Sequence, residues 1–559
     1  MSASPAASRS AARLIVDLLE AQGVSRVFCV PGESYLAVLD ALHDSPIRTI
    51  VCRQEGGAAM MAEATGKLTG EVGVAFVTRG PGATNAAAGL HVAAQDSSPM
   101  VLFVGQVGRD MKEREAFQEL DYKAVFGTIA KWVVEIDDPA RTAELVGRAF
   151  QVALAGRPGP VVVALPEDML HEAVAAGPLR PRLPVAVSPG LNLMVQLQKR
   201  LWAAERPIAV LGGAGWTPAA TAAFQRFAER FDLPVTCSFR RQMLFDNGHA
   251  NYAGDLGIGA NPALLARIKS SDLVLLVGGR LSEMPSQGYS LFGIPDAGVP
   301  LVHVHADVEE LGRVYHADLS ILASPQGFAA AAEGLQPPNR IVWGAETRAA
   351  NADYHAWSDE PPATPGAVQM GDVIRVLRDR LPDDAVLTNG AGNYATWVHR
   401  FWRFRRFGTQ AAPTSGSMGY GLPAAIAAKL ARPEAPVIAF AGDGCFQMTC
   451  QEFGTAMQAE AAVIVIVVDN GIYGTIRMHQ ERNYPARVVA TDLVNPDFAA
   501  LARAYGGFGE TVERTEEFAP AFERALAAGR PALLHLKVDP EAITPTTTIT
   551  ALRAAASRG

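Results

Sequence analysis

Cysteine is scarce in this chain of 559 residues, and its five cysteines are scattered without a C-x-x-C pair. An odd, scattered set argues against a disulfide framework and against a thiolate zinc site. Long apolar runs are also missing, since none reaches the ~18 residues that a membrane-spanning helix needs. The beginning of the chain lacks a signal-peptide core. We therefore predict a soluble, cytoplasmic protein that does not bind a membrane.

Basic clusters are absent as well. The formal net charge is −8 and no Lys/Arg-rich run is present, which argues against nucleic-acid binding. Charged residues make up only 19% of the chain and hydrophobic residues 49%, with 52 Gly and 37 Pro. This mixture is typical of a large α/β enzyme with many tight turns. The length exceeds what one core usually supports, so we expect three domains.

Amphipathic helices alternate with short apolar strands in three parts of the chain, which predicts three domains built on doubly wound parallel sheets. The expected domains cover residues 1–178, 190–335 and 366–545. A Pro-rich linker, 179–189, and a loose Pro-containing stretch, 336–366, are expected between them.

The strongest motif lies in the third expected domain. An apolar strand at 437–440 leads into Gly442-Asp443-Gly444, and a helix is expected from about 445 to 459. The start of a helix offers free N–H groups and the positive end of its dipole to an anion. The glycines permit close approach of a phosphate, and the Asp443 carboxylate suits magnesium. The motif therefore predicts a diphosphate and magnesium site.

A second polar motif follows the next strand. Asn470 comes directly after the apolar strand 463–468 and Asp469. A strand–helix–strand crossover of this length returns to a neighbouring parallel strand, so Asp443 and Asn470 are expected at adjacent strand ends. Either motif alone is also a common turn. Together they favour two oxygens on one ion.

This pair of motifs resembles the thiamine-diphosphate signature of the acetolactate synthase, pyruvate oxidase and benzoylformate decarboxylase superfamily, which includes the acetohydroxyacid synthase large subunit. The resemblance implies thiamine diphosphate and Mg²⁺ as cofactors, with Asp443, Asn470 and the backbone carbonyl of Ile472 as metal ligands. It also implies a pyrimidine-binding domain, a central Rossmann-like domain and a diphosphate-binding domain, in that order. The residues that it assigns to the cofactor in the third domain are Asn393, Tyr394, Gly416, Met418, Gly442, Asp443, Gly444, Cys445, Asn470, Ile472, Tyr473 and Gly474.

Two of these positions have particular roles by resemblance. Met418, in the segment 415–424, matches the bulky residue that props the cofactor into a bent shape and brings its reacting groups together. Asn393 and Tyr394 stand where the family often has Gln-His.

The first domain carries the expected proton-transfer group. The run Arg53-Gln54-Glu55-Gly56-Gly57 resembles the family's glutamate motif, in which the acid bonds the pyrimidine ring and activates the cofactor. A Glu at a helix start can also simply complement the dipole. In the family, the first domain of one subunit meets the third domain of another. The resemblance therefore implies a homodimer or homotetramer with active sites at the subunit interface.

The remaining pocket positions are also assigned by resemblance. Pro31 and Gly32 match a turn near the reacting carbon, and Glu33 stands where acetolactate synthases usually have Gly. Gln118 matches a hydrogen-bond donor to bound intermediates, and His479 replaces the Trp that selects the acceptor keto acid. The catalytic candidates are therefore Glu55, Gln118 and His479.

A flavin is left open by the middle domain. Gly212 to Gly215 and Gly279-Arg280 follow apolar strands as in members that bind FAD. Met284, however, stands where biosynthetic acetolactate synthases have a second Arg.

The implied activity is a thiamine-diphosphate-dependent decarboxylation of a small 2-oxo acid, giving an enamine that is passed to a carbonyl acceptor. Three alternatives are considered: a simple 2-oxo acid decarboxylase or benzaldehyde lyase-like C–C lyase, a non-catalytic cofactor-binding regulatory protein, and a nicotinamide dehydrogenase. The Gly-Asp-Gly and Asn470 pair disfavours the last. Donor, acceptor, the role of Glu33, dimer versus tetramer and a regulatory subunit are not assigned by the sequence.

Overall fold

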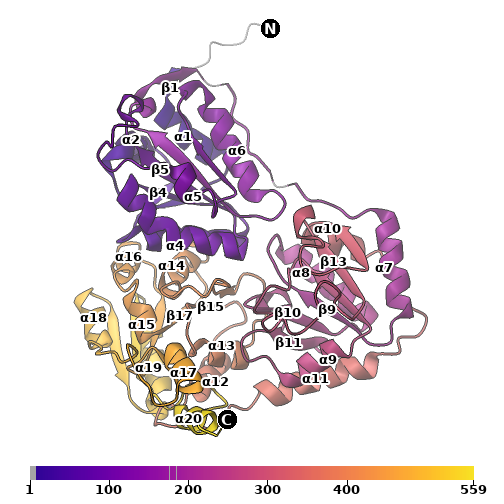
Figure 1. The fold of residues 1–559 in the computed structure, drawn as a ribbon. Helices are drawn as coiled ribbons and strands as arrows, with labels where there is room; N and C mark the ends of the chain where they lie inside the picture. Colours follow the sequence, from indigo (N-terminus) through magenta and orange to yellow (C-terminus); the bar gives the residue numbers. More distant parts are fainter. Residues whose placement is uncertain (1–7, 176, 184, 559) are drawn as a thin grey trace. The chain divides into compact units, whose positions relative to one another are not determined.

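A computed structural model describes residues 8–175, 177–183 and 185–558 of the chain (Figure 1). The first seven residues of the first expected domain and residue 184 of the expected linker lie outside this description. The described chain forms two compact units. One contains the described residues up to 185 together with 426–431 and 449–459, and the other contains the remaining described residues.

The first sheet is parallel and has the strand order β3-β2-β4-β5-β7-β6. Its strands are β2 (Arg26–Cys29), β3 (Arg48–Val51), β4 (Gly73–Val77), β5 (Met100–Gln106), β6 (Trp132–Glu135) and β7 (Pro160–Pro166). Its helices are α1 (Ala11–Ala21), α2 (Leu36–His43), α3 (Glu55–Thr69), α4 (Gly80–Asp96), α5 (Tyr122–Phe126) and α6 (Thr142–Leu154). A short antiparallel pair, β1 (Ser8–Ser10) and β8 (Ala173–Ala175), adjoins this domain.

Small residues let α3 and α4 pack closely. A Cβ on Gly89 would lie 2.4 Å from Cβ of Ala59 across the helix pair, so these positions require small side chains. As a result α3, which begins at Glu55, is buried along nearly its whole length.

The middle sheet is parallel with the order β11-β10-β9-β12-β13-β14. This Rossmann-type order confirms the expected central domain. Its strands are β9 (Pro207–Leu211), β10 (Val235–Ser238), β11 (Tyr252–Leu256), β12 (Leu273–Val277), β13 (Leu301–His305) and β14 (Leu319–Leu322). Its helices are α7 (Leu191–Ala203), α8 (Pro218–Phe231), α9 (Pro262–Lys269), α10 (Pro325–Ala332) and α11 (Gly344–Ser358).

The third sheet is parallel with the order β16-β15-β17-β18-β20-β19, which repeats the connection pattern of the first sheet. Its strands are β15 (Val386–Asn389), β16 (Gln410–Ala411), β17 (Val437–Gly442), β18 (Ile464–Asp469), β19 (Phe508–Val512) and β20 (Ala532–Lys537). Its helices are α12 (Met370–Arg380), α13 (Ala395–Phe401), α14 (Gly421–Ala431), α15 (Asp443–Gln447), α16 (Glu452–Gln458), α17 (Gly474–Asn483), α18 (Phe498–Ala504), α19 (Thr515–Ala527) and α20 (Ile549–Ala556). Three parallel-sheet domains are thus confirmed.

Two local expectations are wrong. The stretch 336–366 contains the helix α11, which forms because Ala350 and Tyr354 pack into the hydrophobic clusters of the middle domain. The single helix expected over 445–459 is broken into α15 and α16. The two halves pack in different units. Residues 449–459 belong to the same compact unit as the first sheet, whereas α15 packs on β17 and β18.

In the described ranges, no helix has both the length and the apolar character required to cross a bilayer.

Candidate functional site

Asp443 is the first residue of α15 and follows β17 directly. It is buried, and its Oδ1 accepts the Gly444 amide at 2.8 Å. Its Oδ2 accepts the Gly471 amide at 2.9 Å and Asn495 Nδ2 at 2.8 Å. β17 and β18 are adjacent parallel strands, so the expected juxtaposition of Asp443 with the Asn470 loop is confirmed.

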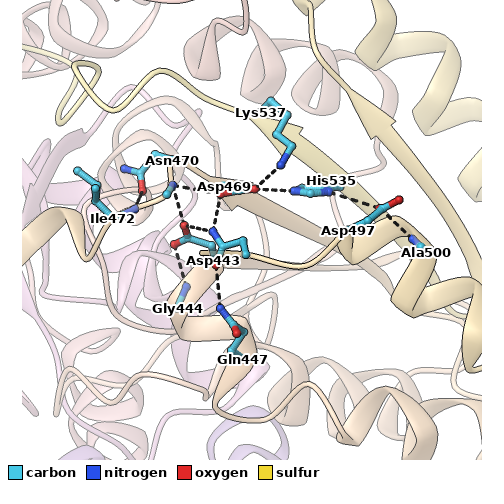
Figure 2. A network of polar contacts seen from close by, with 12 residues as sticks. Asp443, Gly444, Gln447, Asp469, Asn470, Ile472, Asp497, Ala500, His535 and Lys537 are labelled. Carbon is cyan, nitrogen blue, oxygen red and sulfur yellow. Dashed lines mark hydrogen bonds and ion pairs between the residues drawn. The ribbon is translucent and has the colours of Figure 1, made fainter. Parts of the chain in front are cut away.

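A second buried carboxylate, Asp469, stands at the end of β18 and is held from three sides (Figure 2). Its Oδ1 accepts Asn495 Nδ2 at 2.7 Å. Its Oδ2 lies 2.8 Å from His535 Nε2 and 2.6 Å from Lys537 Nζ, both on β20. The Asn495 amide group therefore bridges Asp443 and Asp469, and two residues of the next strand anchor the pair.

The two carboxyl groups have opposite pKa shifts. Burial and the neighbouring Asp469 charge raise the pKa of Asp443 to about 6. Burial also opposes ionisation of Asp469, but hydrogen bonds from His535, Lys537 and Asn495 hold the pKa of Asp469 well below its usual range. The ionised form is thus favoured at Asp469 more than at Asp443, and an added cation beside Asp443 would favour its ionised form.

The donor set at Asp443 fits magnesium. The buried carboxylate and the Asn470 side-chain oxygen are hard oxygen donors, which Mg²⁺ prefers together with phosphate oxygens and water. Asn470 Oδ1 accepts a long bond, 3.3 Å, from the Ile472 amide of its own loop. Within the described ranges no three His, Cys, Asp or Glu side chains gather as a metal cluster. The candidate site is therefore one carboxylate with amide and carbonyl oxygens.

The loops around Asp443 are tied together by Tyr394 and Cys445. The Tyr394 hydroxyl donates to Cys445 Sγ at 3.4 Å and accepts the Gly390 amide at 3.1 Å. Cys445 Sγ also accepts the Gly419 amide at 3.1 Å. Burial raises the pKa of Tyr394 well above its usual value. Tyr394 and Cys445 therefore brace the site through their side chains.

The glycines around Asp443 were expected to let a phosphate come close to the backbone, and packing inside the protein also explains why they carry no side chain. A Cβ on Gly444 would lie 2.5 Å from the Tyr473 ring, and a Cβ on Gly442 would lie 3.1 Å from the Tyr394 ring. Gly474 is similarly crowded, because a Cβ would lie 3.0 Å from Ile543.

Other expected cofactor residues lie in the same domain. Asn393 Oδ1 accepts the Thr475 hydroxyl at 2.9 Å, which joins the loop after β15 to the start of α17. Gly416 has φ +69°, and Met418 packs against the core of this domain. His479 lies exposed on α17.

The expected proton-transfer group lies at the carboxyl edge of the first sheet. Glu55 begins α3, is nearly buried, and accepts Asn85 Nδ2 on Oε2 at 3.0 Å. Gly82 leaves space beside Oε1, since a Cβ there would lie 3.3 Å from it. The Gln54 side chain caps the helix by accepting the Gly57 amide at 3.1 Å.

Gly32 and Glu33 lie at the same sheet edge. A Cβ on Gly32 would lie 2.5 Å from Cβ of Thr78, so only glycine fits there. Thr78 also contacts Ser34, and the two hydroxyl oxygens lie 3.0 Å apart. Pro31 and Glu33 are exposed in the single chain.

Gln118 is held in a left-handed conformation with φ +65°, which is rare for a residue other than glycine. Its carbonyl accepts the Gly80 amide at 3.0 Å at the start of α4, the helix that also carries Gly82 and Asn85. Phe117 is 71% exposed. Strain of this kind concentrates at functional positions, and here it fixes Gln118 at the Glu55 edge of the first domain.

Backbone packing explains two of the middle-domain glycines that suggested a flavin, Gly212 and Gly213. A Cβ on Gly213 would lie 1.7 Å from the Gly278 carbonyl oxygen, and one on Gly212 would lie 3.0 Å from Cα of Gly279. The loops after β9 and β12 therefore touch each other, and no flavin is needed to account for these residues.

The sequence did not identify several residues that support these sites. Asn85 lies in a glycine-rich run without an obvious role, and only the fold shows that it bonds Glu55. Asn495, His535 and Lys537 carry no local motif and lie between 26 and 68 residues from their bonding partners Gln447, Asp443 and Asp469.

The chain has three parallel-sheet domains. One of them carries a carboxylate and an amide side chain at adjacent strand ends, and another carries a buried glutamate at a helix start. These features together define a cofactor-dependent α/β enzyme. Family models agree. Those described as the N-terminal TPP binding domain, the central domain and the C-terminal TPP binding domain of thiamine pyrophosphate enzymes match residues 9–125, 194–332 and 390–536. The chain belongs to the thiamine pyrophosphate enzymes and is acetolactate synthase-like.

Three relatives show the extent of the similarity. The acetolactate synthase isozyme 2 large subunit of Escherichia coli K12 is 32% identical over 535 residues, covering 94% of this chain and 95% of that protein. The acetolactate synthase large subunit of Parasynechococcus marenigrum is 33% identical, with 95% and 87% covered. The probable large subunit of Methanocaldococcus jannaschii is 30% identical, with 96% and 93% covered.

Proposed function

We propose that this chain is a thiamine-diphosphate- and Mg²⁺-dependent 2-oxo acid decarboxylase and carboligase. The observation that carries the proposal is the pairing of Asp443 with the Asn470 loop at the ends of two neighbouring strands, with Gly471 N donating to Asp443 Oδ2. The similarity to acetolactate synthase large subunits over almost the whole chain supports it.

In this proposal Asp443, Asn470 and the Ile472 carbonyl hold the metal, and the start of α15 faces the diphosphate. The Asn495 bridge and the Asp469 anion orient Asp443. When bound, thiamine diphosphate supplies a nucleophilic carbon that adds to a 2-oxo acid and accepts the electrons released with carbon dioxide.

Glu55 is the proposed proton-transfer residue toward the pyrimidine ring. Its contact with Asn85 orients the carboxyl group, and the Gly82 position leaves room beside the other oxygen. Gln118 is proposed to bind the reacting carbonyl groups and His479 to act on the acceptor. By family resemblance we also propose a homodimer or homotetramer, in which Glu55 serves a cofactor bound by the partner, and a cytoplasmic location.

Product analysis tests the proposal directly. The purified chain, supplied with thiamine diphosphate and MgCl₂, is incubated with pyruvate and a panel of other 2-oxo acids, and products are identified by NMR. Acetolactate from pyruvate would mark a carboligase, and acetaldehyde would mark a simple decarboxylase. Cleavage of added acyloins would instead indicate a lyase. Failure to bind the cofactor, or to release carbon dioxide from every 2-oxo acid, would overturn the proposal.

We include no flavin in this proposal. Two of the glycines that suggested one, Gly212 and Gly213, are required by the packing of two loops on each other. Mass spectrometry of the protein as purified checks this point, because a bound flavin would be released on denaturation.

A further inference from the structure

Glu452, on α16, places its carboxylate at the start of the helix that carries Glu55. Its two oxygens accept the Arg53 amide at 3.2 and 3.3 Å, and the Gln54 amide also bonds it. A Cβ on Gly57 would lie 2.5 Å from Glu452 Oε1, so the carboxylate lies directly against the first turn of α3. These residues all belong to one compact unit.

The surroundings of Glu452 are unusual for a carboxylate. The side chain is fully buried, and burial raises its pKa. In the described part of the chain its hydrogen-bond donors are backbone amides and the Thr455 hydroxyl, at 2.6 Å, rather than a cationic side chain. Burying a carboxylate without an ion-pair partner is costly, whereas an amide or apolar residue would cost less.

Neighbouring contacts hold the same segment against the same loop. The Arg53 guanidinium donates to Gln458 Oε1 at 2.8 Å, and Arg48 donates to the Ala459 carbonyl at 2.7 Å. These contacts attach α16 and its C-terminal end to β3 and to the loop before α3. Glu452, in addition, accepts the backbone amides of the two residues that precede Glu55. The direction of the Glu55 side chain follows from that backbone.

We infer that Glu452 is a positioning residue for Glu55: by binding the amides of Arg53 and Gln54 it sets the orientation of the carboxyl group that exchanges a proton with the cofactor. This inference rests on the proposed function. It adds a residue that lies nine positions after Asp443 in the sequence and acts on the first domain.

The test compares Glu452→Gln with the native holoenzyme. Gln keeps the shape but replaces one acceptor oxygen with an NH₂ group that faces backbone donors. We expect hydrogen/deuterium exchange at C2 of bound thiamine diphosphate, followed by acid quench and NMR, to slow about 10-fold. The KM for a 2-oxo acid and the affinity for thiamine diphosphate with Mg²⁺ should change less than about 3-fold.

A double variant separates positioning from general destabilisation. Because Glu452 is inferred to act through Glu55, Glu55→Gln/Glu452→Gln should exchange no more slowly than Glu55→Gln alone. Multiplicative losses in the double variant would overturn the inference. Gln458→Ala is the matched control, since it removes a contact of the same segment without touching Glu452, and its exchange rate should equal that of the native enzyme.

A second readout does not need the cofactor. In the cofactor-free protein, amide hydrogen exchange of a peptide covering 53–60 should be faster in Glu452→Gln and unchanged in Gln458→Ala. If Glu452→Gln does not fold, Thr455→Val takes its place: it removes the hydroxyl that donates to Glu452 at 2.6 Å, together with a longer contact to the Val51 carbonyl at 3.4 Å, and exchange of the same peptide should be faster than in the native protein. Unchanged exchange in both variants overturns the inference, whereas a native enzyme that fails to bind thiamine diphosphate overturns only the proposed function.

Discussion

The first and third sheets share one connection pattern but differ at their carboxyl edges. At the first edge, Glu55 contacts the neutral amide of Asn85 among glycines and alanines. At the third edge, Asp443 shares the Asn495 amide with a second carboxylate, Asp469, which a lysine and a histidine hold.

This difference matches two different tasks. A group that exchanges protons needs a carboxyl oxygen that small neighbours leave accessible, whereas a metal ligand needs a fixed direction and an ionised form. The same sheet topology supports both because the functional groups lie in the loops and helix starts that follow the strands.

The largest expected effect is the loss of turnover when Glu55, at the carboxyl edge of the first sheet, is replaced. Glu55→Gln keeps the shape and the Asn85 contact but cannot exchange a proton, so turnover should fall by about 10²- to 10⁴-fold. Isothermal titration should show that the Mg²⁺-dependent affinity for thiamine diphosphate falls much less. Glu71→Gln, an exposed change just after α3, is the control. Turnover within 10-fold of the native rate would contradict the assignment.

Replacing Asp443, at the carboxyl edge of the third sheet, should weaken binding of the cofactor and the metal instead. Asp443→Ala removes the only carboxylate among the proposed ligands, so the affinity for thiamine diphosphate in Mg²⁺ should fall by about 100-fold or more. A Mg²⁺ titration followed by tryptophan fluorescence measures this. Asp383→Asn, whose side chain is half exposed, should behave as native. An unchanged Mg²⁺ requirement would show that another group binds the metal.

The Asn495 bridge gives a finer test of the third edge. Asn495→Ala removes the donor shared by Asp443 and Asp469, and we expect about 10-fold weaker Mg²⁺-dependent binding, as is typical for outer-shell partners. Gln447→Ala removes an exposed donor to Asn495 Oδ1 but leaves the Asn495 donor to the two carboxylates, and should have less effect. Equal effects of the two variants would argue against the bridge.

The smallest effect is expected at the C-terminal helix. Arg553 on α20 donates to both Glu481 oxygens at 2.6 and 2.8 Å and lowers the pKa of Glu481, on α17, to about 2. A lowered carboxyl pKa stabilises the fold above its unfolded value near 4.5, and this contribution is lost as the pH falls from there toward 2. Arg553→Met should therefore cost about 1 kcal/mol at pH 7.

Melting temperatures of Arg553→Met and the native protein check this between pH 7 and pH 3.5. The difference should be constant down to about pH 5 and shrink below it. Arg558→Met, further along the C-terminal segment, is the control. A difference that grows on acidification would have the wrong sign for this ion pair.

Much of the fold could be predicted because the buried strands are continuous apolar runs and the main helices have clear ends. The strands β17 and β18 and the start of α3 lie within two residues of their expected positions. The helix α11 was missed because only a few apolar residues, such as Ala350 and Tyr354, mark its packed face. The break between α15 and α16 was missed because local periodicity does not show which domain each half packs against.

The sequence by itself determined the family, the three parallel sheets and the candidate residues that closely follow strand ends, Glu55, Asp443 and Asn470, because each is marked by a local motif. Only the tertiary structure decided which groups hold them. Asn495 lies 52 residues from Asp443, Lys537 lies 68 from Asp469, and Glu452 lies 399 from Arg53. Hydrogen bonds between such distant segments depend on how sheets and helices pack, and no local pattern of residues encodes that packing.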